Sequence, residues 1–282
     1  MFIRFTRAAG CVLLSAMLIM NVGCGSIAHE IDREVFGDSA VNDFIDRKGE
    51  DLDKIKELVC DPGEDACLSS SRYDKLGKLK NLETVTFVGI GNEEDAERFF
   101  GELTKLDDLK TVIIKDSRIG SVSKLVDIGG LEELHIILRP FTLDSYKIGD
   151  LDKLAGLKNL RVLDLQNVFK NGFPDLRSLD GLEDLTISAY EIKELPYDLI
   201  DWSGLRSLSI CATGISSIDD RITGDLTDLK KLDISYSNIE DVSFVLELPK
   251  LEEFSYRKHS ANDVDMKILE DHSNFVESWL VD

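Results

Sequence analysis

The feature that most constrains this fold is a leucine that recurs along the chain, at intervals of 22 to 29 residues. Each leucine is followed by apolar residues three and five places later, as Leu109 is followed by Val112 and Ile114. The repeated leucines are Leu82, Leu109, Leu131, Leu160, Leu182, Leu205, Leu229 and Leu251. Eight similar units in succession predict one structural element that is built many times over.

The spacing within each unit predicts a short strand. Residues two apart on a strand face the same side, so the fourth and sixth places of a unit point into one core. A lone unit cannot bury that face, whereas stacked units cover each other and form a solenoid. Each buried leucine or isoleucine contributes roughly 1.5–3 kcal/mol to folding. We therefore expect an α/β solenoid with eight parallel strands over residues 76–260.

One unit supports a family resemblance. Residues 229–242, LKKLDISYSNIEDV, resemble the 22-residue repeats of bacterial internalins, and so place the chain near the leucine-rich-repeat family. The resemblance implies a right-handed horseshoe with strands on the concave face and 3₁₀-like turns on the convex face. The family has asparagine at the ninth place of each unit, and this chain does not. Serine or threonine at that place can supply part of the same bonding, and these residues are Ser117, Thr213 and Ser237.

Other segments interrupt or flank the repeats. Residues 92–101 combine a capping asparagine, acidic residues and then two phenylalanines, which predicts a short helix that ends at Gly101. Residues 139–149 predict a longer loop. Apolar positions at helical spacing over residues 30–60 predict a helical N-terminal cap, because an open solenoid end exposes its core. Residues 261–282 are expected to form a short C-terminal cap.

The N-terminal segment has the features of a secretory signal. Arg4 and Arg7 precede an apolar run over residues 8–20, and no acidic residue occurs before Glu30. The run is shorter than the roughly 20 residues of a membrane-spanning helix. Export of the chain is the expected consequence.

Residues 21–26, NVGCGS, resemble the lipobox of bacterial lipoproteins. The resemblance implies acylation of Cys24 and cleavage just before it, although Asn21 stands where the family usually has leucine. Residues 1–23 are then a signal peptide and residues 24–75 a tether and cap. The expected location is the extracytoplasmic side of the cell envelope, with lipid chains as the membrane anchor.

An exported chain is exposed to an oxidising compartment, which changes the expectation for its cysteines. Cys60 and Cys67 bracket a turn-rich segment, and a disulfide between them is predicted. A metal site is not expected, because no further cysteine or histidine lies near them. Cys211 is expected on an outward strand position, either as a disulfide-forming thiol or as a tolerated small residue.

Partner-binding residues are sought at the outward places of the strands. Apolar residues at these places gather in the first three units, with a histidine and an aspartate beside them. The predicted partner-binding residues are Val88, Ile113, His135, Ile137, Leu138 and Asp164. Two interpretations stay open: these side chains face a ligand, or the loop over residues 139–149 folds over and buries them.

Charge and motif content narrow the function further. The chain has 33 Lys and Arg against 54 Asp and Glu, a net charge of −21, which argues against nucleic acid or a bare anionic lipid surface as partner. No metalloprotease, phosphate-loop or calcium-loop motif occurs. His135 and Cys211 are expected on strands separated by roughly 14 Å, too far for a nucleophile pair.

We therefore expect a non-catalytic, lipid-anchored module that binds a protein partner, with no cofactor and no small-molecule ligand. The alternative interpretation is a structural or regulatory envelope lipoprotein that binds a partner of the same cell. The sequence does not choose between them, because repeat scaffolds place function in surface side chains.

Overall fold

The structure is a computed structural model that describes residues 33–36, 42, 45–46, 49–61, 74–139 and 147–256. The described residues fall into two compact units. The N-terminal unit contains the described residues up to 183 together with residues 198–201. The C-terminal unit contains residues 184–197 and 202–256. Each unit is described by itself below.

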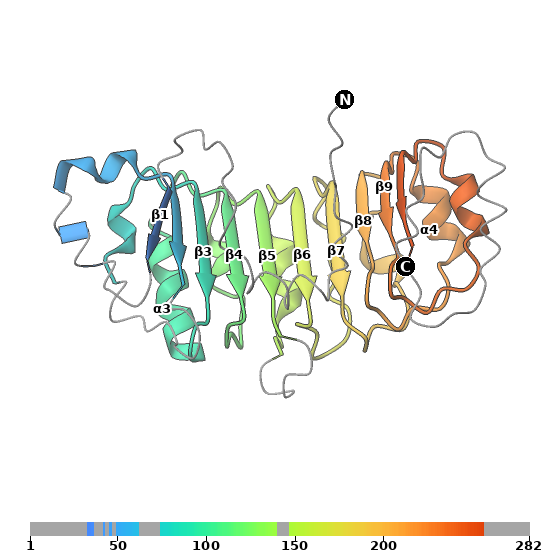
Figure 1. The fold of residues 1–282 in the computed structure, drawn as a ribbon, viewed down its shortest axis with the longest axis horizontal. Helices are drawn as coiled ribbons and strands as arrows, with labels where there is room; N and C mark the ends of the chain where they lie inside the picture. Colours follow the sequence, from blue (N-terminus) through green and yellow to red (C-terminus); the bar gives the residue numbers. More distant parts are fainter. Residues whose placement is uncertain are drawn as a thin grey trace, which may run out of the picture. The chain divides into compact units, whose positions relative to one another are not determined.

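The N-terminal unit is built on parallel strands in which each strand pairs with the next one in sequence (Figure 1). The strands are β1 (Arg33–Phe36), β2 (Glu57–Cys60), β3 (Thr84–Val88), β4 (Thr111–Lys115), β5 (Glu133–Ile137) and β6 (Val162–Gln166). The register aligns the same place of successive units, so Val85 lies beside Val112 and Val112 beside Leu134. This alignment is what stacked repeats require.

The C-terminal unit repeats the same arrangement with strands that, after the first one, are 3 residues long each. These are β7 (Asp184–Ser188), β8 (Ser207–Ser209), β9 (Lys231–Asp233) and β10 (Glu253–Ser255), which again pair in parallel and in sequence order. The eight repeat units thus form β3 to β10, and the predicted solenoid of parallel strands is confirmed.

The segments that connect the strands are mostly single 3₁₀ turns, as the family resemblance implies. They are η1 (Gly49–Lys54), η3 (Leu76–Lys78), η4 (Leu125–Asp127), η6 (Leu151–Gly156), η7 (Tyr197–Leu199) and η8 (Ser243–Glu247). Two connections hold α-helices, α3 (Glu93–Leu103) and α4 (Asp220–Asp225). Short connections are sufficient because the two strands that each one joins are neighbours in the sheet, so the connection returns over a single layer of core.

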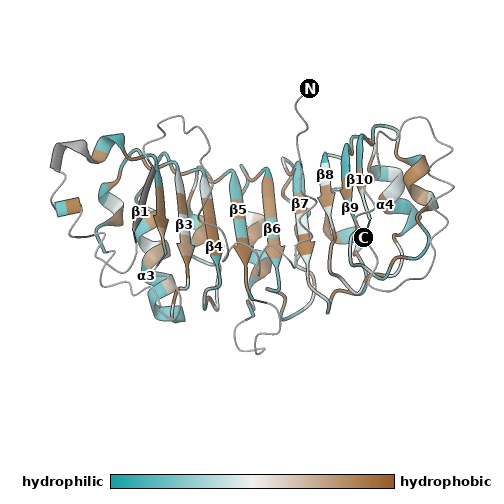
Figure 2. Ribbon diagram, in the orientation of Figure 1, coloured by the Kyte–Doolittle hydropathy of each residue, from teal (hydrophilic) through white to brown (hydrophobic). Residues whose placement is uncertain are grey.

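The core of each unit contains the inward side chains of its strands and the leucines of its turns. Val112 and Ile114 of β4 are fully buried, and so are Leu208 of β8 and Ile234 after β9, to within 1%. Figure 2 shows hydrophobic colour along the strands and hydrophilic colour at many strand ends and in the connections. The predicted inward direction of the fourth and sixth places is confirmed.

Buried hydroxyls at the ninth place bond to the backbone of their turns. The Ser117 hydroxyl donates to the Lys115 carbonyl oxygen at 2.7 Å and accepts from the Ile90 backbone N–H at 3.0 Å. Thr213 donates to the Ile210 carbonyl at 3.0 Å, and Ser237 to the Ile234 carbonyl at 2.7 Å. Serine and threonine therefore satisfy buried backbone groups where the family uses asparagine.

The helix predicted over residues 92–101 is present as α3. The Asn92 side chain accepts the Asp95 backbone N–H, as its predicted capping role requires. The helix continues two residues beyond Gly101 to Leu103. The reason is the buried stripe of Phe99, Phe100 and Leu103, which only a further half-turn completes.

The prediction of a helical cap over residues 30–60 is wrong in two segments. Residues 33–36 and 57–60 form β1 and β2, which extend the parallel sheet ahead of the first leucine repeat. Leu58 and Cys60 are fully buried and two residues apart, which is strand spacing. The short apolar run over residues 57–60 is compatible with the spacing of a helix and with that of a strand, and pairing with β3 favours the strand.

The predicted disulfide between Cys60 and Cys67 is also wrong. Cys60 is a free, fully buried thiol at the end of β2, in register with Phe87 of β3. Burial raises the pKa of this thiol far above its ordinary value. Cys67 itself lies outside the described residues, as do the signal peptide over residues 1–23, Cys24 and the C-terminal cap over 261–282.

Candidate functional site

The candidate site is the outward side of β3 to β6, which we call the strand face. It consists of the side chains at the third, fifth and seventh places of four units. They are Thr84, Thr86, Val88, Thr111, Ile113, Lys115, Glu133, His135, Ile137, Val162, Asp164 and Gln166. All are half-buried except Gln166, which is 6% exposed. The strand face therefore offers partly accessible apolar and polar side chains on one rigid sheet.

Register brings the predicted partner-binding residues together. Ile113 lies beside His135, and His135 beside Asp164, in one row across three strands. Ile137 lies in the next row between Lys115 and Gln166. Val88 lies beside Lys115 at the edge of the same row. Five of the six predicted residues thus share one face of the N-terminal unit.

A polar cluster occupies the centre of β5 and β6. The His135 Nδ1 and Asp164 Oδ2 atoms lie 3.4 Å apart. The Gln166 side-chain amide donates to both Asp164 oxygens, at 3.0 and 3.2 Å. The Asp164 side chain is 14% exposed and the His135 side chain 25%. These contacts orient the Asp164 carboxylate on the sheet.

Leu138 does not belong to the strand face, contrary to the prediction. Its side chain is only 1% exposed. Strand β5 ends at Ile137, so the alternation of inward and outward side chains no longer applies one residue later. Beyond Leu138, the loop predicted over residues 139–149 lies largely outside the described residues, which resume at Lys147.

Cys211 is likewise buried rather than outward-facing. Strand β8 ends at Ser209, and the chain turns before it reaches Cys211. The Ser209 hydroxyl and the Cys211 sulfur lie 3.4 Å apart inside the C-terminal unit. The predicted outward position of Cys211 is therefore wrong, whereas the alternative that its sulfur forms a disulfide agrees with the structure, in which Cys211 is disulfide-bonded.

A row of alternating charges occupies the residue before β2 and the second places of the first five repeats. We call it the charge ladder, and its members are Lys56, Glu83, Lys110, Glu132, Arg161 and Glu183. Glu83 pairs with Lys56, and Lys110 lies 3.2 Å from Glu132. Arg161 lies 2.8 Å from Glu183, whose hydrogen bond and charge raise the pKa of Arg161.

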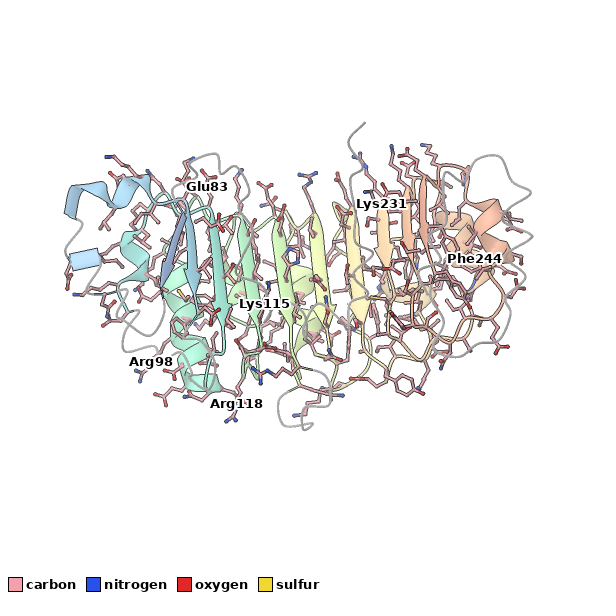
Figure 3. The ribbon with its side chains drawn as sticks, in the orientation of Figure 1. Glu83, Arg98, Lys115, Arg118, Lys231 and Phe244 are labelled. Carbon is pink, nitrogen blue, oxygen red and sulfur yellow. The ribbon has the colours of Figure 1, made fainter. Side chains whose placement is uncertain are left out.

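Figure 3 shows Glu83 of the ladder near the start of β3 and Lys115 of the strand face toward the other end of β4. The ladder neutralises its own charges, because each of its carboxylates has a cation on a neighbouring repeat. Exposed pairs of this kind contribute little to stability individually.

Sequence reasoning missed Glu133 and Gln166 as members of the site. Both occupy outward places, the third and the seventh, in the units that supply His135 and Asp164. Their polar character had hidden them from a search for exposed apolar residues. The strand register, once known, is the signal that finds them.

Within the part of the chain that the structure describes, no group of three or more His, Cys, Asp and Glu side chains is arranged to hold a metal ion. In the same residues, no helix combines the length and apolar character needed to cross a membrane. The strand face has the chemistry of a contact surface: branched apolar side chains, an aspartate and a histidine, and one lysine.

Comparison with known proteins bears on the fold. No family model matches the chain. It is 30% identical over 117 residues to an uncharacterised leucine-rich-repeat-containing protein of Schizosaccharomyces pombe, a match that covers 41% of this chain and 18% of that protein. The greater part of that relative therefore has no counterpart in the match.

Solved structures of low sequence identity share the fold. Internalin InlF of Listeria monocytogenes aligns with a TM-score of 0.50 at 20% identity, over 75% of this chain and 63% of that one. Internalin C2 of the same organism aligns with a TM-score of 0.50 at 22% identity, over 73% and 82%. TLR13 from a complex with single-stranded RNA aligns with a TM-score of 0.50 at 15% identity, over 75% and 37%. The chain therefore has the leucine-rich-repeat fold, with internalins among its structural neighbours.

Proposed function

We propose that this chain is a non-catalytic protein-binding module, anchored by lipid at Cys24 to the bacterial cell envelope, which recognises its partner with the strand face. The observation that carries the proposal is the row Ile113, His135 and Asp164, where apolar and polar side chains lie half-buried on one rigid sheet. Binding surfaces typically combine such an apolar centre with a few oriented polar groups.

The arrangement of charge supports the same function. The chain carries a net charge of −21, so a basic protein partner is attracted and nucleic acid is repelled. A rigid scaffold lowers the entropy cost of binding, because its contact side chains are positioned before the partner arrives. The alternative function is that of a structural or regulatory envelope lipoprotein, whose partner comes from the same cell.

The anchor is tested by fractionation of cells that express the wild type or Cys24→Ala. We expect the wild type in the membrane fraction and Cys24→Ala in the soluble extracytoplasmic fraction, because acyl chains are the proposed attachment. If both proteins fractionate alike, the lipid-anchor part of the proposal is wrong.

The binding face is tested on intact cells with a photo-crosslinking amino acid at Ile113, and with the same amino acid at Glu97 as the control. Glu97 is exposed on α3, away from the strand face. We expect a specific adduct from position 113 and none from position 97. Mass spectrometry of the adduct separates the two functions, since it identifies the partner as foreign or as a protein of the same cell. Equal crosslinking from both positions would exclude the strand face as the binding site.

A further inference from the structure

The carboxylates of the strand face differ from those of the charge ladder. In the ladder, Glu132 and Glu183 each form an ion pair with a lysine or arginine. On the strand face, Glu133 accepts only the Thr111 hydroxyl, at 3.3 Å, and Asp164 contacts only His135 and Gln166. Among the residues that the structure describes, neither carboxylate forms an ion pair with lysine or arginine. Asp164 therefore lacks the cation that a carboxylate in a poorly hydrated position favours, and Glu133 has only the charge of Arg161 nearby, without an ion pair to it.

Glu133 and Asp164 lie on neighbouring strands of the strand face. Register places Glu133 beside Val162 and His135 beside Asp164, so Glu133 and Asp164 are diagonal neighbours on β5 and β6. Diagonal neighbours on a sheet lie about 7–8 Å apart at Cα, within reach of a long side chain placed between them. A guanidinium with its five N–H groups can donate to both.

Gln166 supplies a second, independent feature of this position. Gln166 occupies an outward place but is only 6% exposed, and its amide nitrogen donates to Asp164. No described residue donates a hydrogen bond to its amide oxygen. A buried acceptor without a donor is costly, and a donor supplied by a partner would remove that cost.

Apolar side chains lie on both sides of the cluster. Ile113 and Ile137 flank His135, one on the neighbouring strand and one two residues along β5. The aliphatic stem of an arginine and its apolar neighbours can pack against such side chains. Because this packing excludes water, it strengthens the ionic contact between the arginine and the carboxylates.

We propose that the strand face binds its protein partner through a basic side chain, an arginine by preference, seated between Glu133 and Asp164 with apolar neighbours against Ile113 and Ile137. The inference rests on the proposed function, because it names the chemistry of the partner at that same surface. The net charge of −21 adds long-range attraction for such a partner.

The test selects peptides from a random phage-displayed library on the full chain purified in detergent. We expect the selected peptides to share an arginine or lysine beside apolar residues. Asp164→Asn should weaken their binding by about 10- to 100-fold, as loss of a charged hydrogen bond does. Glu133→Gln should also weaken it. The matched control, Glu132→Gln, removes a ladder carboxylate and should change the affinity by less than about twofold.

Replacement of the peptide arginine by citrulline gives a double-mutant cycle. Citrulline has nearly the shape of arginine but no charge, so it should weaken binding to the wild type and have little further effect on Asp164→Asn. Circular dichroism of every variant checks that the fold is retained. Additive effects of the two changes would overturn the proposed contact.

A final variant separates the inference from the proposed function. If Ile113→Asp abolishes binding while Asp164→Asn does not, and the selected peptides carry no basic residue, the strand face binds proteins but the inferred chemistry is wrong. If neither variant changes binding, or no peptide is enriched, both the inference and the proposed binding face are overturned.

Discussion

The eighth place of the repeat adopts a left-handed backbone in five of the described units. The residues at this place have φ between 50° and 74°, and they are Gly89, Asp116, Asn167, Ala212 and Tyr236. In this conformation the N–H of the residue still reaches the next strand, as Asp116 N–H does to the Ile137 carbonyl at 2.9 Å. An L-residue there costs about 1–2 kcal/mol relative to glycine's freedom. The turn out of each strand requires this geometry, and the backbone hydrogen bond to the next strand offsets its cost.

Gly89 and Gly101 allow a matched test of this argument. Gly89 has φ of 74°, whereas Gly101 lies inside α3 with no atom within 4 Å of an added Cβ. Gly89→Ala should lower the free energy of unfolding by about 1 kcal/mol, because alanine is strained at positive φ. Gly101→Ala should raise it by about 0.5–1 kcal/mol, because alanine favours the helix.

Urea denaturation followed by circular dichroism measures both variants of this pair. The opposite signs are the essential result, since each change adds the same methyl group. A stabilising Gly89→Ala would mean that the eighth place does not require a left-handed residue in solution.

At the residue scale, the sequence predicted the inward positions well and the outward ones less well. The fourth and sixth places are both inward because residues two apart on a strand point to the same face, and this spacing can be seen in the sequence of each unit. Leu138 and Cys211 were misplaced because strand alternation was extended beyond the end of β5 and of β8. The length of each strand depends on pairing with its neighbours, which one unit's sequence does not contain.

At the scale of elements, Asp150 links two successive connections of the N-terminal unit. Its carboxylate accepts the Val122 backbone N–H at 2.9 Å and the Ser121 hydroxyl at 2.7 Å, and it lies 3.0 Å from Lys153. Burial alone would raise the pKa of Asp150, but these bonds and the lysine together lower it below its ordinary value. The ionised carboxylate therefore holds one turn against the next.

A lowered pKa in the folded state makes stability depend on pH. The contribution is fully present above the ordinary aspartate pKa and is lost as pH falls through the lower, folded-state value. Asp150→Asn should lower the free energy of unfolding at pH 7 by about 1–2 kcal/mol, since asparagine binds these donors without a charge. The difference in free energy of unfolding between the wild type and Asp150→Asn should become smaller below about pH 4.

Urea titrations at several pH values test the role of Asp150. The control is Asp127→Asn, which changes an exposed carboxylate of η4. The difference in free energy of unfolding between the wild type and Asp150→Asn could instead stay constant down to pH 2, about two units below the ordinary aspartate pKa. That result would show that the carboxylate charge does not contribute to stability.

The sequence predicted the elements of the repeats but not the start of the sheet. Helix α3 was predictable because its capping asparagine, acidic first turn and buried phenylalanines agree. Strands β1 and β2 were not, because residues 30–60 also carry apolar residues at helical spacing. Pairing with β3 decides between the two periods, and that contact is non-local.

At the scale of the whole molecule, each strand that the structure describes pairs, within its unit, with its neighbours in sequence. Stability in such a solenoid is close to a sum of repeat and nearest-neighbour contributions. A change in one unit should therefore affect adjacent repeats strongly and remote repeats weakly. This behaviour differs from that of a domain with a single shared core, which loses stability uniformly.

Leu232→Ala tests this locality. Leu232 is 2% exposed in β9 and lies in register with Leu208 of β8 and Phe254 of β10. Its truncation should cost about 2–5 kcal/mol in local stability, because it leaves a cavity in the core. Hydrogen exchange of the backbone amides should rise in β8 to β10 and stay nearly unchanged in β4 and β5. Leu163→Ala in β6 is the reciprocal control and should reverse the pattern. Equal acceleration of exchange in every strand would instead mean that the described repeats unfold as one cooperative unit.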